Sequence, residues 1–309
     1  MGGSQQSAVS SQHAAPIVSG VAQTPIVAQM LHETTRELKR HRIDDAQLEA
    51  EVMLAAAMRI DRTRLLARLR DAAPADSITP FETMVARRLE REPLAYILGR
   101  REFYGIEIEC AAGALIPRPE TELLVELVLD EIATRAGGSV RVADVGTGSG
   151  AIAVAIALNA SGARVTAIDA SAGALAIARR TVARYEMKRS VTLVEGDLLA
   201  GAGTFDGIVA NLPYVAEDEW PSLALEIREH EPREALVAGA AGTELIERLL
   251  EIAPAHLAPG GLLAAEIGCT QGARVLDVAR RRFPDAECEV RTDLGGLDRV
   301  LVVRKHQGG

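Results

Sequence analysis

Short apolar stretches and longer amphipathic ones alternate from residue 140 to the end of the chain, and this alternation constrains the fold most. The expected strands are 140–145, 164–169, 191–195, 206–210, 261–267, 286–292 and 298–304. The expected helices are 149–159, 171–186, 242–257 and 271–282. This order predicts an α/β fold with a doubly wound sheet of seven strands. Only residues 293–296 join the last two strands, so we expect these to form an antiparallel pair at one edge.

The rest of the chain divides into segments of different character. Residues 1–23 contain no Lys, Arg, Asp or Glu and are rich in Ser, Gln, Ala and Gly, so we expect a disordered tail. Residues 24–92 are predicted to form a small helical bundle, because their apolar residues recur at helical spacing. Residues 93–117 are predicted to be a connector with a β-hairpin, in which Phe103–Glu109 alternates as a strand does. The sheet domain is then expected to cover residues 118–305.

Local signals predict where the helices of the bundle begin. Asp44 and Asp61 have short acceptor side chains that suit the N-caps of the second and third helices. Thr79 followed by Pro80 predicts the start of the fourth helix, because proline is favoured in the first helical turn.

A glycine-rich turn follows the first expected strand of the sheet. Glycines permit positive φ angles and let a ligand approach the backbone closely. The spacing Gly-x-Gly-x-Gly after Asp144 favours S-adenosyl-L-methionine over a dinucleotide, because a carboxylate repels a pyrophosphate and attracts an ammonium group. Asp169 ends the next strand, where an acidic side chain commonly accepts ribose hydroxyls. The candidate cofactor-binding residues here are Asp144, Gly146, Thr147, Gly148, Gly150, Asp169 and Asp197. The alternatives are a tight turn without a ligand and, for Asp197, a turn or capping role.

The sequence Asn211-Leu212-Pro213-Tyr214 closes the fourth expected strand and forms a second candidate site. In open α/β sheets, ligands bind beyond the carboxyl ends of the strands. The Asn211 side chain and the Leu212 carbonyl can together accept two hydrogen bonds from one planar NH2 group. Pro213 prevents the strand from continuing, and Tyr214 can stack on the group that carries this nitrogen. These four residues are the candidate catalytic residues; the alternative is an Asx-turn with Tyr214 in the core.

Charge and cysteine content restrict the partners. The net charge is −9, whereas a nucleic-acid binder normally carries a basic footprint, so we expect no direct nucleic-acid partner. Cys110, Cys269 and Cys288 lie far apart and are expected to be buried thiols in a reducing, cytoplasmic compartment. No apolar run reaches the roughly 18 residues that crossing a bilayer requires, so we expect no membrane association. We also expect a monomer without a bound metal.

With these motifs, the chain resembles the HemK-type protein-(glutamine) methyltransferases, which modify peptide chain release factors. The resemblance extends from about residue 25 to residue 305. It rests on Glu92–Gly99, Glu102–Gly105, Ile116–Glu122, Asp144–Gly150, Asn211–Tyr214, Glu231-Pro232, Glu266–Gly268 and Asp293–Gly296. The Pro-Arg-Pro-Glu-Thr-Glu and Glu-Phe-Tyr-Gly stretches are more specific than Asn-x-Pro-Tyr, which resembles a motif of adenine-modifying DNA methyltransferases.

The resemblance implies a Rossmann-like, class I S-adenosyl-L-methionine-dependent methyltransferase domain that follows a helical bundle. It implies methyl transfer to the side-chain amide nitrogen of the glutamine in the Gly-Gly-Gln motif of class 1 peptide chain release factors. Deprotonating an amide would need a base far stronger than any side chain here. Orientation of the nitrogen toward the methyl group is therefore the expected source of catalysis.

The resemblance also implies roles for individual residues. The expected substrate-binding residues are Phe103, Asn211, Tyr214 and Glu266, and Asn211 and Arg118 join the cofactor-binding set. A salt bridge from Arg118 to Glu120 or Glu122 is an equally weighted alternative, and Glu266 also suits a capping role. Leu212 stands where the family usually has proline, so we expect a looser loop that retains the carbonyl.

Three rival functions stay open at this point. A nucleic-acid exocyclic-amine methyltransferase would share the Asn-x-Pro-Tyr sequence, although the acidic charge counts against it. An NAD-dependent oxidoreductase would use a similar glycine-rich turn. A cofactor-binding adaptor without catalytic activity would result if Leu212 had abolished methyl transfer.

Overall fold

The computed structural model describes residues 25–134, 139–199 and 201–307. The chain forms two compact units that divide between Glu82 and Thr83. The predicted tail, residues 1–23, lies outside the described residues. The sequence analysis places the end of the helical bundle at residue 92, whereas the compact units divide after Glu82. The predicted domain boundary therefore stays a prediction.

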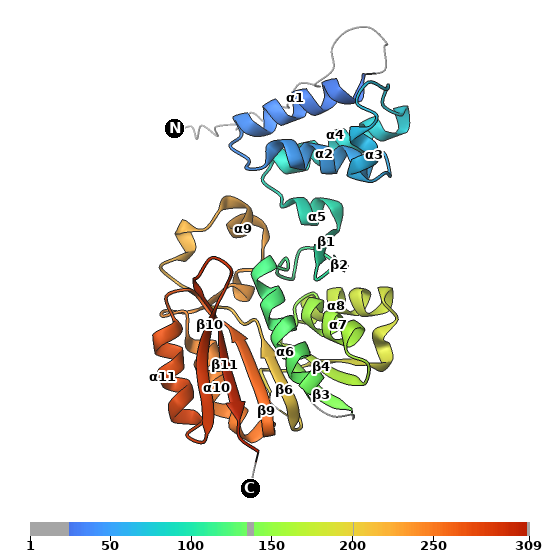
Figure 1. Ribbon diagram of the computed structural model, residues 1–309. Helices are drawn as coiled ribbons and strands as arrows, with labels where there is room; N and C mark the ends of the chain where they lie inside the picture. The colour runs from blue at the N-terminus through green and yellow to red at the C-terminus, as the bar shows by residue number, and fades with distance from the viewer. Residues whose placement is uncertain (1–24, 135–138, 200, 308–309) are drawn as a thin grey trace, which may run out of the picture. The chain divides into compact units, whose positions relative to one another are not determined.

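The first unit is built from helices (Figure 1). It holds α1 Val27–Arg40, α2 Ala46–Ala57, α3 Arg62–Leu66 and the first part of α4 Ala75–Leu89. Leu38, Leu54 and Leu65 are fully buried between these helices. Because burial of apolar surface contributes about 25 cal/mol per Å², these inward faces stabilise the bundle. The predicted helical character of this segment is confirmed.

Two of the predicted helix starts are wrong. The residue before α2 is Asp45, not Asp44, and it adopts a left-handed conformation without a side-chain capping bond. The helix α4 begins at Ala75 and contains Pro80. It begins this early because the Ser77 amide donates a hydrogen bond to the Pro74 carbonyl, which forms the first turn. Pro80 is the sixth residue of α4, so its missing N–H removes one backbone hydrogen bond inside the helix. Asp61 caps α3 as predicted, by accepting a hydrogen bond from the Arg64 amide.

A seven-stranded sheet forms the centre of the second unit (Figure 1). Its strands are β3 Val140–Val145, β4 Ala163–Asp169, β5 Val191–Glu195, β6 Phe205–Ala210, β9 Leu257–Glu266, β10 Ala286–Thr292 and β11 Asp298–Lys305. Their spatial order is β10-β11-β9-β6-β3-β4-β5, and β11 is antiparallel to both neighbours. The predicted seven strands and the antiparallel edge pair are therefore confirmed. Strand β9 begins four residues earlier than the expected start at 261, because Leu257 pairs with Phe205 across a bulge.

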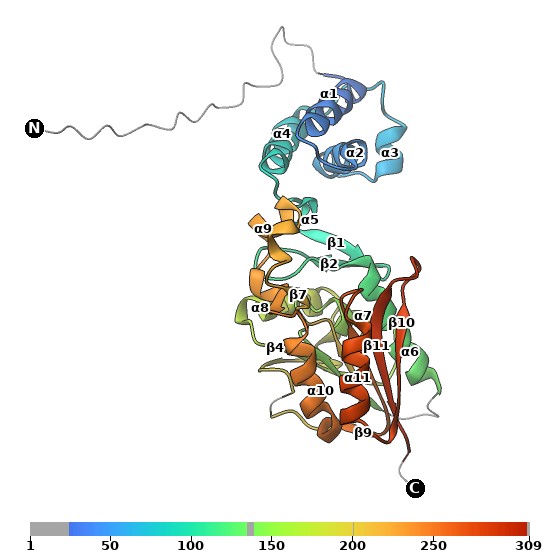
Figure 2. The same ribbon diagram turned by 90° about the vertical axis from the view of Figure 1, so that its left-hand side faces the viewer.

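Helices cover both faces of this sheet (Figure 2). One face packs against α6 Glu122–Thr134, α7 Ala151–Asn159 and α8 Ala172–Arg184. The other packs against α10 Glu244–His256 and α11 Gly272–Arg282. In β3, Val142 faces the first layer and Ala143 the second, so successive side chains enter opposite cores. This burial on both faces explains why the central strands are predominantly apolar.

Along the sequence, smaller elements occur between α4 and the first strand of the sheet, and again after β6. They are α5 Leu94–Leu98, β1 Arg100–Phe103, β2 Ile106–Glu109, β7 Val215–Ala216, α9 Leu225–His230 and β8 Val237–Gly239. Strands β1 and β2 form the predicted hairpin, whereas the short parallel pair of β7 and β8 was not predicted.

The three cysteines differ in their burial. Cys110 is buried and Cys288 is partly buried, but Cys269 is exposed, so the expected burial is wrong for that residue. Cys269 lies in the loop after β9, where its side chain has no core to enter. Among the residues that the structure describes, no helix combines the length and apolarity needed to cross a bilayer.

Candidate active site

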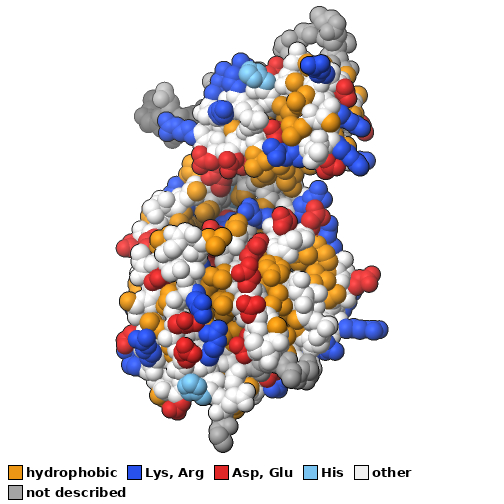
Figure 3. Space-filling model, in the orientation of Figure 1, with side chains coloured by type: hydrophobic (Ala, Val, Ile, Leu, Met, Phe, Trp, Pro, Cys, Tyr) orange, Lys and Arg blue, Asp and Glu red, His pale blue; other side chains and the backbone are white. Residues whose placement is uncertain are grey.

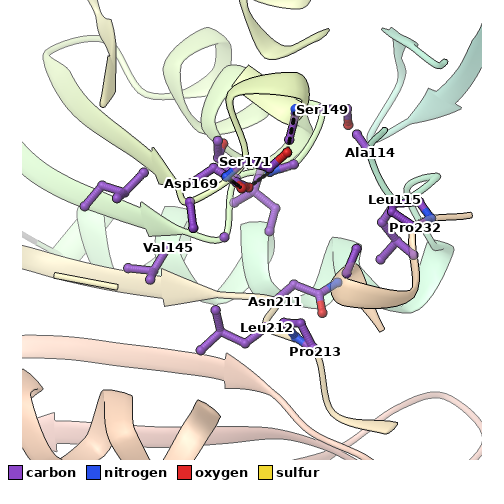
Figure 4. A pocket seen from close by; sticks show the side chains of 18 of the residues that line it. Ala114, Leu115, Val145, Ser149, Asp169, Ser171, Asn211, Leu212, Pro213 and Pro232 are labelled. Atoms are coloured by element: carbon purple, nitrogen blue, oxygen red, sulfur yellow. Dashed lines mark hydrogen bonds between the residues drawn. The ribbon is translucent and has the colours of Figure 1, made fainter. Parts of the chain in front are cut away.

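A cavity of about 320 Å³ opens at the carboxyl ends of β3, β4 and β6 (Figure 4). Strand order reverses here, because β4 lies on one side of β3 and β6 on the other. Ligands of open α/β sheets bind at such a switch point. The cavity is lined by the glycine-rich turn after β3, by Asp169 and Ser171 after β4, and by Asn211, Leu212 and Pro213 after β6.

The glycine-rich turn brings its backbone close to this cavity. Gly146, Gly148 and Gly150 have φ angles of 76°, 55° and 80°, which explains why glycine occupies each position. A Cβ atom on Gly148 would meet nothing within 4 Å, so this residue faces open space. A Cβ atom on Gly150 would lie 3.2 Å from that of Ala178 in α8, so this glycine lets two helices approach. Gly146, Thr147 and Gly148 all line the cavity, whereas Gly150 supports the turn from behind.

Asp169 connects the glycine-rich turn to the end of β4. Its Oδ2 accepts a hydrogen bond from the Gly148 amide at 2.8 Å, and its Oδ1 accepts one from the Ser171 amide at 2.8 Å. Both carboxylate oxygens retain lone pairs that can face a ligand. Asp197 also lines the cavity, but its exposed carboxylate forms an ion pair with Arg248 at 2.6 Å.

Asp144 lies outside the cavity lining. Its side chain is completely buried, and its Oδ2 accepts hydrogen bonds from the Thr147 hydroxyl at 2.6 Å and the Ala153 amide at 3.1 Å. Burial raises the pKa of Asp144 to about 7. The structure thus places this residue where it supports the turn, and its expected contact with a ligand stays a prediction. Successive side chains of a strand point to opposite faces of the sheet, and Asp144 points to the face that α7 covers.

Asn211 is held in one orientation at the end of β6. Its Nδ2 donates a hydrogen bond to the Thr121 hydroxyl at 3.0 Å. Thr121 in turn donates to Glu266 at 2.7 Å. Among the described residues, none donates to the Asn211 side-chain oxygen or to the Leu212 carbonyl. Two acceptors are therefore available next to the cavity, as the sequence predicts for a site that binds an NH2 group.

Leu212 stands where the resemblance leads us to expect proline. Its side chain is buried in the core under the second helical layer. Its Cδ2 also lies 3.0 Å from the place of a Cβ atom on Gly146, so it packs over the glycine-rich turn. Packing thus restrains the loop at a position where proline would restrain it through φ.

Tyr214 and Glu266 do not line the cavity. The Tyr214 hydroxyl donates a hydrogen bond to Glu266 at 3.2 Å, and burial raises the pKa values of both groups. Gln271 fixes the backbone here, because its Nε2 donates to the Tyr214 carbonyl at 2.7 Å. The expected contacts of Tyr214 and Glu266 with a substrate stay predictions. Phe103, in contrast, lines the cavity as predicted.

Arg118 forms a salt bridge with Glu231, whose carboxylate also accepts a hydrogen bond from the Ile116 amide at 3.1 Å. The proposed pairing with Glu120 or Glu122 is wrong, because Glu122 instead accepts a hydrogen bond from the Tyr104 amide. Sequence reasoning missed Thr121 and Gln271. Thr121 belongs to the Pro-Arg-Pro-Glu-Thr-Glu stretch, which was its only signal, and nothing in the sequence marks Gln271.

Replacing Leu212 by alanine should lower the free energy of unfolding by about 2–3 kcal/mol. We expect the lower part of the usual range because the side chain already borders an open cavity. Chemical denaturation monitored by circular dichroism measures this change. Leu294→Ala is the matched control, since Leu294 is fully exposed and should change stability by less than about 0.5 kcal/mol. Equal stability of both variants would show that packing does not restrain this loop.

Comparison with known proteins places this geometry in a family. The PrmC N-terminal domain family matches residues 29–99, and the methyltransferase small domain family matches residues 119–233. A release-factor-specific protein-(glutamine-N5) methyltransferase structure from Alicyclobacillus acidocaldarius is 30% identical, covers 64% of this chain and 99% of its own, and has a TM-score of 0.40.

Two curated relatives match almost end to end. The release factor glutamine methyltransferase of Geobacter sulfurreducens is 38% identical, over 89% of this chain and 95% of its own length. That of Nitratidesulfovibrio vulgaris is 38% identical, over 90% of this chain and 94% of its own length. On this identity and coverage, the chain belongs to the release factor glutamine methyltransferase family.

Proposed function

We propose that the protein transfers a methyl group from S-adenosyl-L-methionine to the side-chain amide nitrogen of the glutamine in the Gly-Gly-Gln motif of class 1 peptide chain release factors. The observation that carries this proposal is the pair of acceptors, the Asn211 side-chain oxygen and the Leu212 carbonyl, next to the cavity of the glycine-rich turn. Membership of the family supports the same substrate.

The cavity fits the cofactor. Gly148 leaves open space above the turn, and the Asp169 carboxylate lines the cavity where it can accept ribose hydroxyls. Asp197 lines the same cavity and is placed to accept from an amine of the base, once it leaves Arg248. When bound, S-adenosyl-L-methionine supplies a methyl group on a positively charged sulfur.

Asn211 and Leu212 provide orientation. An amide nitrogen is a poor nucleophile, because its lone pair is delocalised into the carbonyl group. Two acceptors that hold both of its N–H groups fix the direction of the lone pair before the attack. The C–S bond of the methyl group then breaks as the N–C bond forms, and the nitrogen, now strongly acidic, releases one of its two protons to water. Such alignment can lower an activation barrier by about 7–11 kcal/mol. The apolar rings of Phe103 and Pro213 line the cavity and exclude water from the reacting atoms.

The charge distribution bears on the class of substrate. On the one face of the second unit that Figure 3 shows, acidic and basic side chains are interspersed and form no continuous basic patch. A protein that binds nucleic acid through its phosphates usually carries such a patch. The expected cytoplasmic location, the monomeric state and the absence of a direct nucleic-acid partner stay predictions.

Incubation with labelled S-adenosyl-L-methionine and a purified class 1 release factor tests the function. We expect one methyl group on the glutamine of the Gly-Gly-Gln motif, located by peptide mapping and mass spectrometry. A release factor with that glutamine replaced by glutamate is the control and should stay unlabelled. Labelling of DNA or RNA in place of the release factor, or no labelling of either, would reject the proposal.

A further inference from the structure

We propose that Thr121 and Glu266 act as positioning residues that determine which way round the Asn211 amide is held. In this inference, which rests on the proposed function, the pair turns the Asn211 NH2 group away from the substrate and presents the side-chain oxygen to it. Neither residue needs to touch the reacting atoms.

The hydrogen bonds form a short chain from the core to the cavity. Asn211 Nδ2 lies 3.0 Å from Thr121 Oγ1, and Thr121 Oγ1 lies 2.7 Å from Glu266 Oε2. Glu266 Oε1 accepts a hydrogen bond from the Tyr214 hydroxyl at 3.2 Å. Thr121 is 4% exposed and Glu266 is 3% exposed, so water does not compete freely for these contacts.

The direction of each of these hydrogen bonds follows from counting the hydrogens that each group can donate. An ionised carboxylate only accepts hydrogen bonds, and a threonine hydroxyl has a single hydrogen to donate. Because Thr121 donates that hydrogen to Glu266, it can only accept from Asn211. The reverse orientation of the Asn211 amide would place its oxygen against the lone pairs of Thr121. With Oε2 of Glu266 unprotonated, the orientation with the oxygen free is therefore the only one that satisfies every group.

The charge state of Glu266 is compatible with these hydrogen-bond directions. Burial raises the pKa of Glu266, while hydrogen bonds from Thr121 and Tyr214 and the positive charge of Arg299 oppose that rise. A proton on Oε1, shared with Tyr214, would still leave Oε2 to accept from Thr121. The direction of these hydrogen bonds thus depends only on Oε2 of Glu266, which must be free to accept.

The local sequence explains how Thr121 reaches this place. Pro119–Thr121 forms a single 3-10 turn between an extended Arg118 and the start of α6. Proline in the first position of this turn fixes its φ angle. The turn directs Thr121 toward Glu266 at the end of β9. The Pro-Arg-Pro-Glu-Thr-Glu stretch thus positions the Thr121 hydroxyl close to the cavity.

Thr121→Val removes the hydroxyl and keeps the shape of the side chain. We expect kcat for release factor methylation to fall about tenfold, the factor of one ordinary hydrogen bond. The KM for the release factor, the Kd for S-adenosyl-L-methionine and the melting temperature should change little. Thr121→Ser restores the hydroxyl and should restore kcat. Full activity of the valine variant, or an equal loss in the serine variant, would overturn the proposal.

A nuclear magnetic resonance measurement tests the orientation without turnover. In wild-type protein with labelled asparagine, the Asn211 side-chain NH2 protons should show a nuclear Overhauser effect to the Thr121 methyl group. Its absence, with the Asn159 amide resonances visible as a reference, would overturn the proposal even if the enzyme is active. If the wild-type protein fails to methylate any release factor, the proposed function fails, and this measurement still decides the orientation of Asn211.

Discussion

Replacing Asn211 by alanine is expected to lower kcat for release factor methylation by about 10²–10³-fold, similar to the loss of one pre-organised polar group in other enzymes. The variant keeps the Leu212 carbonyl but loses one of the two acceptors that hold the substrate amide. The nitrogen then samples orientations that do not point toward the methyl group. Because the side chain also lines the cavity, activity is measured at saturating cofactor, with the Kd determined separately.

The chain offers a matched control for this variant. The chain has two asparagines, and the other one, Asn159, lies at the end of α7, where its Nδ2 donates to the Ala155 carbonyl at 2.9 Å. It does not line the cavity, so Asn159→Ala should leave kcat unchanged. Near-normal turnover of Asn211→Ala, with intact cofactor binding, would remove Asn211 from the mechanism.

Features that depend on short stretches of sequence were predictable. The approximate positions of the strands and helices of the sheet domain follow from apolar periodicity, because the central strands β3, β6 and β9 are largely buried on both faces. The glycine-rich turn was predictable for the same reason, since positive φ angles restrict the residue type locally. Asp169 lines the cavity as expected, because the end of a strand determines where its last side chain points.

Contacts between distant segments were not predictable in this way. Glu231 pairs with Arg118 across 113 residues of sequence, whereas Glu120 and Glu122 are closer along the chain and do not pair with it. Asn211 and Thr121 are 90 residues apart, and their contact depends on how α6 packs beside β6 and β9. Asp144 does not line the cavity, because its position two residues before the first glycine does not reveal which face of the sheet it points to. Residue type identified the candidate groups, but tertiary packing decided which of them reach the cavity.

Replacing Asp169 by alanine is expected to raise the Kd for S-adenosyl-L-methionine by about 10²–10³-fold, because each hydrogen bond to a charged group contributes about 1.5–3 kcal/mol. The variant loses the acceptor for ribose hydroxyls. It also leaves the amides of Gly148 and Ser171 without their partner, so the turn that faces the cofactor is no longer held against β4. Isothermal titration calorimetry measures the Kd directly.

Asp206→Ala provides the control for this last variant. Asp206 likewise accepts a hydrogen bond from a backbone amide, that of Arg141 at 2.8 Å, but it lies near the amino end of β6 and does not line the cavity. Its loss should therefore lower stability slightly and leave the Kd unchanged. If Asp169→Ala binds the cofactor within about threefold of the wild-type Kd, a difference of less than 1 kcal/mol, then the carboxylate neither contacts the ribose nor organises the turn. The cofactor would then have to bind away from the carboxyl end of β4, against the rule for open sheets.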